Sequence, residues 1–540
     1  MGKIVEIPMG KRKPLYRFLE ILPGALSYLS IILLFVLSAI NPVWGAVYML
    51  ILISITFTKA IATAIRTVKG QRAMEAALRV DWRQRRLDLL TPHESYERLK
   101  YVKSNGYEFD EHLDNLKKMS VAGRDEYPDA DKIWQVVIMA AYNEGLETLV
   151  PSIEAVRDTD YPNDRIIFVL AYEERGGEQM CENAKFLKEK FKGTFNDFVL
   201  SEHPKNLKGE IVGKGPNLTF AGEKLRKYVE QRGLREENII ITSLDSDNRM
   251  HKMYLDAVAY EFVVHRERQR LSYQPISIFT NNVWDAPAPS RIIAISNSFF
   301  NVITTTMPHA LRNFASHSQP YVALKNMNFW SKRTIVEDGH QYWRSLFFFD
   351  GDYDVLSIRV PIYQDAVISE TLTETLKAQF VQLRRWDYGA SDVAYVGTEL
   401  FSKDRRVPLT VLVPRFVRLL DGHVTCAYMA PVVAFGGFVP MLMNLSSRGM
   451  IAFNLPNIVS IIQTIALIGT IVTIFTSFRL LPKRPAKYGK NKSFHMVIQW
   501  ILMPIVALFY TSLAAFYSQT RLLTGNYMEK FDVTKKVVKK

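Results

Sequence analysis

The sequence predicts an α/β domain on the cytoplasmic side of a membrane, flanked by α-helical transmembrane segments. Apolar runs near both ends of the 540-residue chain are long enough to cross a bilayer. Basic residues stand on both sides of the first apolar stretch, which places its flanks in the cytoplasm. Between the apolar regions, a strand, a helix and a second strand follow one another, as in a βαβ unit of a parallel sheet.

Composition narrows the class of protein. The net charge is +14, and the basic residues gather beside the apolar runs without forming a separate stripe. This distribution is typical of contact with anionic membrane lipids, so nucleic-acid binding is not expected. The two cysteines, Cys181 and Cys426, are too few for a disulfide framework.

The first 130 residues divide into three predicted parts. Residues 1–20 form a basic cytoplasmic N-terminus, and residues 21–65 form a transmembrane hairpin that turns at Asn41-Pro42. A cleaved signal peptide is the alternative, but it does not account for two apolar runs in tandem. Residues 66–130 form a charged, helical cytoplasmic linker to which no role is assigned.

Polar side chains follow three predicted buried strands in the central region, at 133–139, 165–170 and 239–241. Ligands bind beyond the carboxyl ends of parallel strands, so we expect these side chains to cluster there. They are Tyr142, Asn143 and Glu144 after the first strand, Glu173 and Glu174 after the second, and Asp245 and Asp247 after the third.

Asp245 and Asp247 are the candidate metal ligands. Alternate side chains at the end of a strand point the same way, so both carboxylates can face one volume. Hard oxygen ligands suit Mg²⁺ or Mn²⁺, which in turn would hold a diphosphate. The alternative is a polar strand-to-loop turn, for which the local sequence Asp-Ser-Asp-Asn is also suited.

A glycine-rich stretch at 209–217 precedes a helical pattern and contains Lys214 and Asn217. Its backbone amides and the Lys214 ammonium can lie near a diphosphate. An ordinary flexible loop is the alternative.

Glu337 and Asp338 form a second carboxylate pair, far from the first in sequence. Adjacent carboxylates can raise each other's pKa, which suits a general base working near neutral pH. Acidic residues are also typical of the first turn of a helix. Both interpretations can hold together.

Gln382, Arg385 and Trp386 share one face of a helix predicted over 373–388. Arginine binds phosphate oxygens and tryptophan stacks on a sugar ring, so this face predicts a sugar-and-phosphate platform. A membrane-surface helix with Arg and Trp at the interface is the alternative.

The C-terminal region is again apolar, with a second transmembrane hairpin predicted over 421–480 and a basic cytoplasmic loop after it. A further apolar run at about 494–519 can span the membrane, lie along its interface, or turn back at Pro504. The last two arrangements keep the basic tail in the cytoplasm.

In the order of its motifs, the chain resembles the family 2 membrane glycosyltransferases, which include bacterial cellulose synthase and hyaluronan synthase. The resemblance covers residues 133–390 well and the membrane arrangement loosely. The tail is similar to the gating loop of cellulose synthase, which tips the run at 494–519 toward an interfacial or re-entrant element. The motifs are Tyr142-Asn143-Glu144, Lys214 to Asn217, Asp245-x-Asp247, Glu337-Asp338, Gln382-x-x-Arg385-Trp386 and Phe531-x-Val533-Thr534-x-Lys536.

The resemblance implies a GT-A (Rossmann-like) catalytic domain at 131–372, interface helices at 373–420 and a gating-like tail within 481–540. It implies an inverting, metal-dependent transfer, using Mg²⁺ or Mn²⁺, from a nucleotide-diphosphate sugar, with a UDP-sugar favoured. The acceptor would be a glycan or a lipid-linked molecule at the cytoplasmic face of the cell (inner) membrane. Four predicted spans are few for a channel through which one chain exports a glycan. Such a path across the membrane can instead be formed by an oligomer.

The same resemblance implies roles for single residues. Asp245 and Asp247 would hold the nucleotide and the metal, Glu173 or Glu174 would contact the nucleobase, and Asp338, beside Glu337, would be the base. Gln382, Arg385 and Trp386 would bind diphosphate and acceptor, with Lys214 and Lys536 offsetting charge on the leaving group. The chain departs from the family pattern at Ala141, at Glu173-Glu174-Arg175-Gly176 and at Val336.

Two other functions compete with this one. A transporter or channel could carry a cytoplasmic domain that binds nucleotides without turnover, although the apolar runs contain few ionisable residues. A scaffold that keeps the fold without catalysis is the other, but all the candidate catalytic residues are present.

Overall fold

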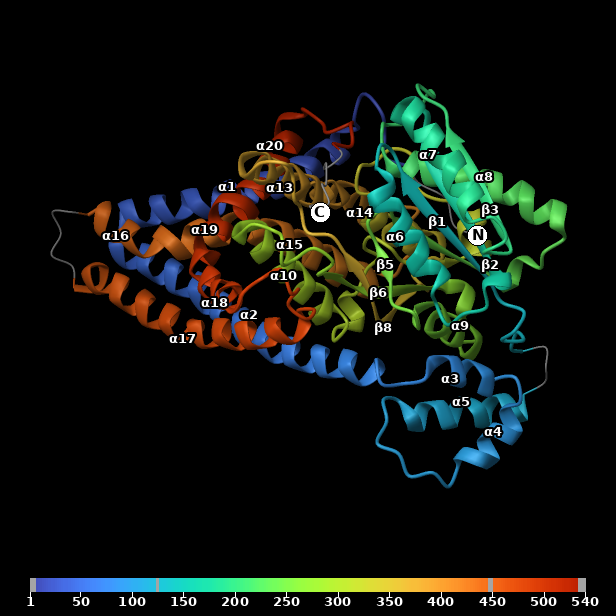
Figure 1. Cartoon of the computed structure of the whole chain (residues 1–540). Helices are drawn as coiled ribbons and strands as arrows, with labels where there is room; N and C mark the ends of the chain where they lie inside the picture. The colour runs from blue at the N-terminus through green and yellow to red at the C-terminus, as the bar shows by residue number, and fades with distance from the viewer. Residues whose placement is uncertain (1–5, 123–125, 445–449, 533–540) are drawn as a thin grey trace.

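An eight-stranded mixed sheet lies at the centre of the α/β domain in this computed structural model, which describes residues 6–122, 126–444 and 450–532 (Figure 1). The strand order is β3-β2-β1-β4-β7-β6-β8-β5. The first four strands are parallel, whereas β7 runs antiparallel to both β4 and β6, and β5 antiparallel to β8. The strands are β1 (Trp134–Ala141), β2 (Ile166–Glu173), β3 (Asp197–His203), β4 (Ile239–Asp245), β5 (Arg249–Met250), β6 (Leu271–Phe279), β7 (Ser318–Pro320) and β8 (Asp354–Gln364).

The helices fall into two groups, one around the sheet and one in a bundle beside it (Figure 1). Those from α3 to α14 are α3 (Trp82–Asp88), α4 (Pro92–Leu99), α5 (Phe109–Val121), α6 (Leu146–Arg157), α7 (Gly177–Lys190), α8 (Lys214–Arg232), α9 (Tyr254–Val264), α10 (Ala288–Thr304), α11 (Tyr321–Asn326), α12 (Glu337–Phe348), α13 (Leu372–Asp387) and α14 (Asp392–Leu400). The remaining ones are α1 (Pro14–Ile40), α2 (Pro42–Ala77), α15 (Leu409–Phe435), α16 (Val439–Leu442), α17 (Met450–Leu480), α18 (Lys490–Ile498), α19 (Met503–Val506) and α20 (Leu513–Thr524).

Helices cover both faces of the parallel strands, as a βαβ pattern predicts. Successive side chains of β1 enter opposite layers because strand side chains alternate. Val137 and Met139 join the buried cluster that includes α6, α7 and α9, whereas Val136 and Ile138 join the cluster that includes α8 and α11. The three strands predicted from sequence are therefore confirmed as the central strands β1, β2 and β4.

The crossovers bring the polar ends of these strands to one edge of the sheet. Asp245, the last residue of β4, is paired with Ala140 of β1. On the other side of β1, Ala141 is paired with Tyr172, next to Glu173 at the end of β2. The pairing of β1 with β2 and β4 therefore brings the polar residues after these strands to the same edge of the sheet, as predicted.

The bundle contains the apolar helices, and the described residues include four stretches long and apolar enough to cross a membrane: Pro14–Ile40, Pro42–Ala77, Leu409–Leu442 and Lys490–Thr524. The predicted turn separates the first two, where the Asn41 side chain accepts a hydrogen bond from the Val43 amide at 2.8 Å. Helices α1, α2, α15 and α17 run alongside one another away from the sheet, and the run from α18 to α20 crosses them (Figure 1).

Candidate functional site

Lys214, the first residue of α8, connects three parts of the candidate site. Its ammonium lies 2.5 Å from Asp245 Oδ1 and 3.5 Å from Glu337 Oε1. The next residue, Gly215, permits this approach: a Cβ there would stand 2.3 Å from the Ser331 carbonyl oxygen and 3.1 Å from Glu337 Cβ. The glycine-rich stretch therefore ends in a helix N-terminus that touches both β4 and α12.

The charges in this cluster stabilise one another. Burial alone would lower the pKa of Lys214, but Asp245, Glu337 and Asp338 together raise it above its ordinary value, so the ammonium stays charged. Burial raises the pKa of both Glu337 and Asp338, and Lys214 opposes the rise. Burial also lowers the pKa of Arg385, and the same three carboxylates partly offset this by raising it.

The two carboxylates of α12 occupy different environments. Glu337 is 3% exposed and paired with Lys214, whereas Asp338 is half-buried. Asp338 Oδ1 also accepts a hydrogen bond from the amide of the next residue, Gly339, at 2.7 Å. The helix N-terminus interpretation of this pair is confirmed, because α12 begins at Glu337. The general-base role stays a prediction, and Asp338 is the more accessible carboxylate.

Asp247 lies beside the loop that follows β1. The Tyr142 amide donates to Glu144 Oε2 at 2.7 Å, and burial raises the pKa of Glu144, which lies near Ser246 and Asp247. On its other side, the Asp365 amide donates to Asp247 Oδ2 at 3.3 Å. The first and third predicted motifs are thus brought together.

Metal binding by Asp245 and Asp247 stays a prediction, and Asp245 is paired with Lys214 in this structure. No three acidic, His or Cys side chains converge on one point in the described part of the chain. Mg²⁺ is commonly held by one or two carboxylates together with substrate phosphates, without a cage made only of protein ligands. Two carboxylates beside a lysine and a helix N-terminus match that partial set.

At the end of β2, the two predicted nucleobase contacts, Glu173 and Glu174, have different partners. Glu173 is buried and paired with Arg175, whose guanidinium lies 4.7 Å from the centre of the Tyr142 ring. Glu174 turns the other way and pairs with Lys205 at 3.3 Å. Sequence reasoning did not select Arg175, although its position directly after two glutamates is a signal that could have done so.

Asn217 lies beneath the strand ends. It is 1% exposed, and its side-chain amide donates to the carbonyl oxygens of Ala171 at 2.9 Å and of Ala141 at 3.5 Å. These bonds join the ends of β1 and β2, which supports the loop that carries Tyr142 and the exposed Asn143. Direct contact between Asn217 and a donor stays a prediction.

Helix α13 presents its motif toward the same region. The Arg385 guanidinium lies 3.9 Å from the centre of the Phe531 ring and donates to the Asp532 carbonyl oxygen at 3.2 Å. Gln382 is buried and accepts from Gln379 at 3.2 Å. Trp386 packs against Phe279 at 6.0 Å between ring centres, next to the apolar loops that follow β6 and β8.

The C-terminal tail lies over the start of α8. The Phe531 amide donates to the Val212 carbonyl oxygen at 2.8 Å, and Arg384 pairs with Asp532. The other residues of the gating-like motif, Val533, Thr534 and Lys536, lie outside the described residues. Sequence reasoning missed the Arg384–Asp532 pair, because nothing local links positions 148 residues apart.

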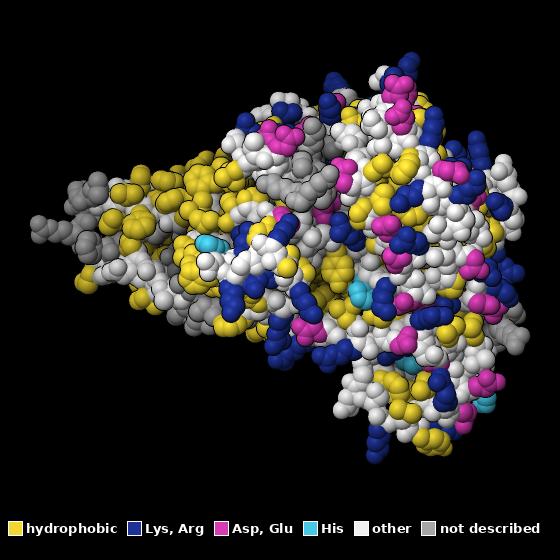
Figure 2. Space-filling view, in the orientation of Figure 1, with side chains coloured by type: hydrophobic (Ala, Val, Ile, Leu, Met, Phe, Trp, Pro, Cys, Tyr) yellow, Lys and Arg dark blue, Asp and Glu magenta, His cyan; other side chains and the backbone are white. Residues whose placement is uncertain are grey.

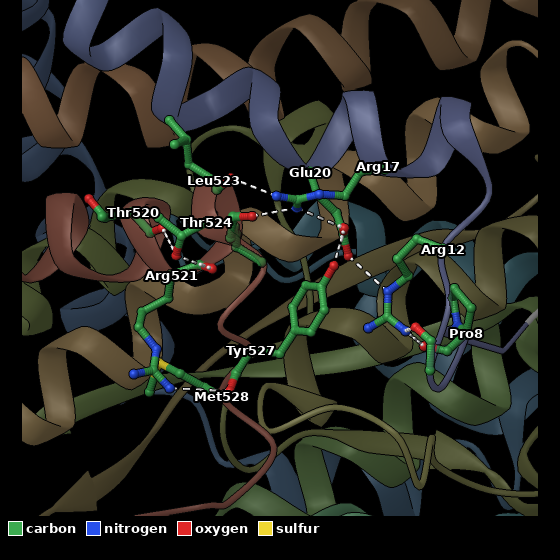
Figure 3. Close-up of polar contacts among 12 residues, drawn as sticks. Pro8, Arg12, Arg17, Glu20, Thr520, Arg521, Leu523, Thr524, Tyr527 and Met528 are labelled. Atoms are coloured by element: carbon green, nitrogen blue, oxygen red, sulfur yellow. Dashed lines mark hydrogen bonds and ion pairs between the residues drawn. The ribbon is translucent and has the colours of Figure 1, made fainter.

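Glu20 of α1 holds the tail from the other side (Figure 3). It is 3% exposed and accepts hydrogen bonds from Arg12 Nε at 3.1 Å, Arg17 Nη1 at 3.2 Å and the Tyr527 hydroxyl at 2.7 Å. Arg12 also lies 4.3 Å from the centre of the Tyr527 ring. Arg17 donates to the Leu522 carbonyl oxygen at the C-terminus of α20, at 2.5 Å. These residues form a clamp that fixes the tail four residues before Phe531.

We expect Glu20→Gln to loosen the tail, because it leaves two half-buried arginines without their carboxylate. A hydrogen bond to a charged group contributes about 1.5–3 kcal/mol, so amide hydrogen exchange across 525–532 should rise about tenfold or more. Tyr527→Phe should produce a smaller rise, since its ring stays over Arg12. Thr524→Ala, whose hydroxyl bonds only within α20, is the matched control. If amide hydrogen exchange across 525–532 were unchanged in Glu20→Gln, the clamp would not be what holds the tail.

No protein-family model matches the chain, and no curated protein matches its sequence. Among solved structures, mannosyltransferase PcManGT from Pyrobaculum calidifontis in complex with GDP-Man and Mn²⁺ is 12% identical, with a TM-score of 0.43 over 85% of this chain and 99% of that one. TarS 1–349 from S. aureus in complex with UDP is 11% identical, with a TM-score of 0.31 over 73% of this chain and 91% of that one. Similarity at this level assigns no function, which is inferred below from the site's own residues.

Proposed function

We propose that this chain is a GT-A membrane glycosyltransferase of the family 2 type, which transfers a sugar from a nucleotide-diphosphate sugar to a glycan or lipid-linked acceptor. The observation that carries the proposal is the convergence of Lys214, Asp245 and the Glu337-Asp338 pair at the carboxyl end of β4. This set supplies a cation for a leaving diphosphate and a carboxylate base in one place.

The donor would lie along the carboxyl edge of the sheet. Mg²⁺ or Mn²⁺ on Asp245 and Asp247 would neutralise charge on the diphosphate. Lys214, Arg385 and the N-terminus of α8 offset the negative charge that develops as the bond from sugar to phosphate breaks. The Tyr142 ring, with Arg175 against it, offers a surface for the nucleobase.

Asp338 is assigned the base. It takes the proton of the acceptor hydroxyl while that oxygen attacks the anomeric carbon and the diphosphate leaves from the opposite side. A single displacement of this kind inverts the anomeric centre, and it needs only one carboxylate. Glu337 is assigned a positioning role, since it is buried and paired with Lys214.

The rate of sugar transfer should fall as the pH is lowered. A base works only when deprotonated, and burial raises the pKa of Asp338 above its ordinary value. We therefore expect kcat to fall about tenfold per pH unit below that raised pKa, and the acid limb to lie above pH of about 4. A pH profile at saturating donor measures this. A profile that stays flat down to pH 4 would remove Asp338 from the base role.

The membrane arrangement is part of the proposal. The hairpin of α1 and α2 and the helices α15 to α17 would span the cell membrane, with the α/β domain in the cytoplasm. The run from α18 to α20 would lie along the interface, which its crossing of the bundle in Figure 1 supports. That placement keeps the tail on the same side as the site it covers.

A donor panel tests the function. Purified protein in detergent is incubated with UDP-, GDP-, ADP- and CDP-sugars, with Mg²⁺, with Mn²⁺ or with chelator, and release of nucleoside diphosphate is measured. We expect one nucleotide class to be turned over only when metal is present. Binding without turnover of any donor would favour the non-catalytic alternatives.

A further inference from the structure

A cavity of about 450 Å³ lies where the α/β domain meets α18, away from the carboxylate cluster. Its wall comes from the start of α10, the start of α13 and one side of α18. Ala286 and Ile368 line it and also belong to the apolar group that packs against Trp386. One apolar layer therefore separates this cavity from Trp386.

Buried hydrogen-bond donors without protein partners line this cavity. Arg291 is 4% exposed, and its Nε donates to Gln499 Oε1 at 2.5 Å. Arg291 Nη1 and Gln499 Nε2 are buried and have no hydrogen-bond partner among the described residues. Burial lowers the pKa of Arg291 to about 10. Two such donors side by side suit an anion with several oxygens.

The other charged groups around the cavity leave it positive. Lys492 of α18 lines it together with Arg291, and the neutral His495 ring borders it. Asp285 is the acidic residue in the lining, and it is already paired with Lys487 at 2.8 Å and bonded to the Tyr488 hydroxyl. The N-terminus of the 16-residue helix α13 adds a partial positive charge, although Glu374 caps it at Thr371.

The cavity is bordered by a surface that suits a lipid chain. Exposed apolar side chains repeat along one face from α18 to α19: Phe494, Val497, Ile498, Ile501 and Ile505. Exposed basic residues precede them, at Lys483, Arg484, Lys487 and Lys490. Figure 2 shows Lys and Arg side chains gathered where the apolar surface of the bundle meets the mixed surface of the domain. An apolar face beside basic residues is typical of helices that lie in a membrane interface.

We propose that this cavity binds the phosphate of a membrane lipid, with Arg291, Gln499 and Lys492 as its ligands and the lipid chain along α18. Nothing in the sugar-transfer reaction requires this site, so it goes beyond the proposed function. It would hold a lipid phosphate one apolar layer away from Trp386, which the sequence resemblance implicates in acceptor binding.

Binding of short-chain lipids to the full-length protein in detergent tests this directly, without sugar transfer. The probes are dioctanoyl phosphatidic acid, dioctanoyl phosphatidylcholine and inorganic phosphate, titrated by native mass spectrometry. We expect saturable binding of phosphatidic acid, and at least about tenfold weaker binding of the other two. Phosphatidylcholine carries less negative charge on its phosphate, which is also esterified to a choline cation. Inorganic phosphate has no acyl chains.

Variants locate the site. Arg291→Gln should weaken phosphatidic acid binding about tenfold or more, and Lys492→Gln, at the less buried edge, several-fold. Lys227→Gln, an exposed residue of α8 that does not line the cavity, should leave binding unchanged. Lys492→Gln keeps the test decisive if Arg291→Gln does not fold. Equal binding of both lipids, equal binding of inorganic phosphate, or no effect of Lys492→Gln would each overturn the proposal.

Discussion

Asp338→Asn should lower sugar transfer about 10³-fold, within the range that general bases contribute, while donor binding is retained. Asparagine keeps the size of the side chain and can still accept the Gly339 amide, but it cannot take a proton. The measurement pairs a transfer assay under saturating donor with a titration of the nucleoside diphosphate in the presence of Mn²⁺.

The matched control for this variant is Asp350→Asn, just beyond the other end of α12. Asp350 has a φ of +53°, which asparagine tolerates, and it lies away from the carboxylate cluster. If Asp338→Asn lost donor binding as well as rate, Asp338 would be a donor ligand and the base would have to be another group. If it kept full activity, the proposed reaction step would be wrong.

Asp245→Asn should show the opposite pattern, with loss of donor binding and of the response to metal. The change removes a charged oxygen from the metal and diphosphate site and removes the nearest partner of Lys214. Removing even an outer partner of a metal site lowers affinity about 10- to 100-fold, so we expect at least about 10²-fold weaker Mn²⁺-dependent nucleotide binding.

Calorimetric titration of nucleoside diphosphate, with and without Mn²⁺, measures this. Asp197→Asn is the control, because Asp197 begins β3 at the opposite end of the strands and pairs with Arg232 at 3.3 Å. If Asp245→Asn kept Mn²⁺-dependent binding of the nucleoside diphosphate, Asp245 would be part of a polar turn and not a metal ligand.

Local pattern explains what could be predicted from the sequence. The apolar runs that became β1, β2 and β4 end in polar side chains, and parallel topology carries those ends to one edge. The start of α12 at Glu337 followed from its acidic residues, which are typical of a first helical turn. Helix α8 begins at Lys214, inside the glycine-rich stretch that was expected to precede it. The helix predicted over 373–388 became α13, Leu372–Asp387.

Contacts between distant segments could not be predicted in this way. The stacking of Arg385 on Phe531 and the hydrogen bond from Tyr527 to Glu20 join parts of the chain far apart in sequence. Asn217 shows a further limit, because its position in the motif does not reveal that its amide is bonded to strand carbonyls. Periodicity reports which face is buried, but not which residue will lie opposite.

The most direct test is a structure of the protein with Mn²⁺ and a non-hydrolysable analogue of the donor found in the panel. The account predicts the diphosphate between Asp245 and Asp247 on one side and Lys214 and Arg385 on the other, with Phe531 over it. A nucleotide bound elsewhere on the domain, or a diphosphate out of reach of Lys214 and Asp245, would contradict it.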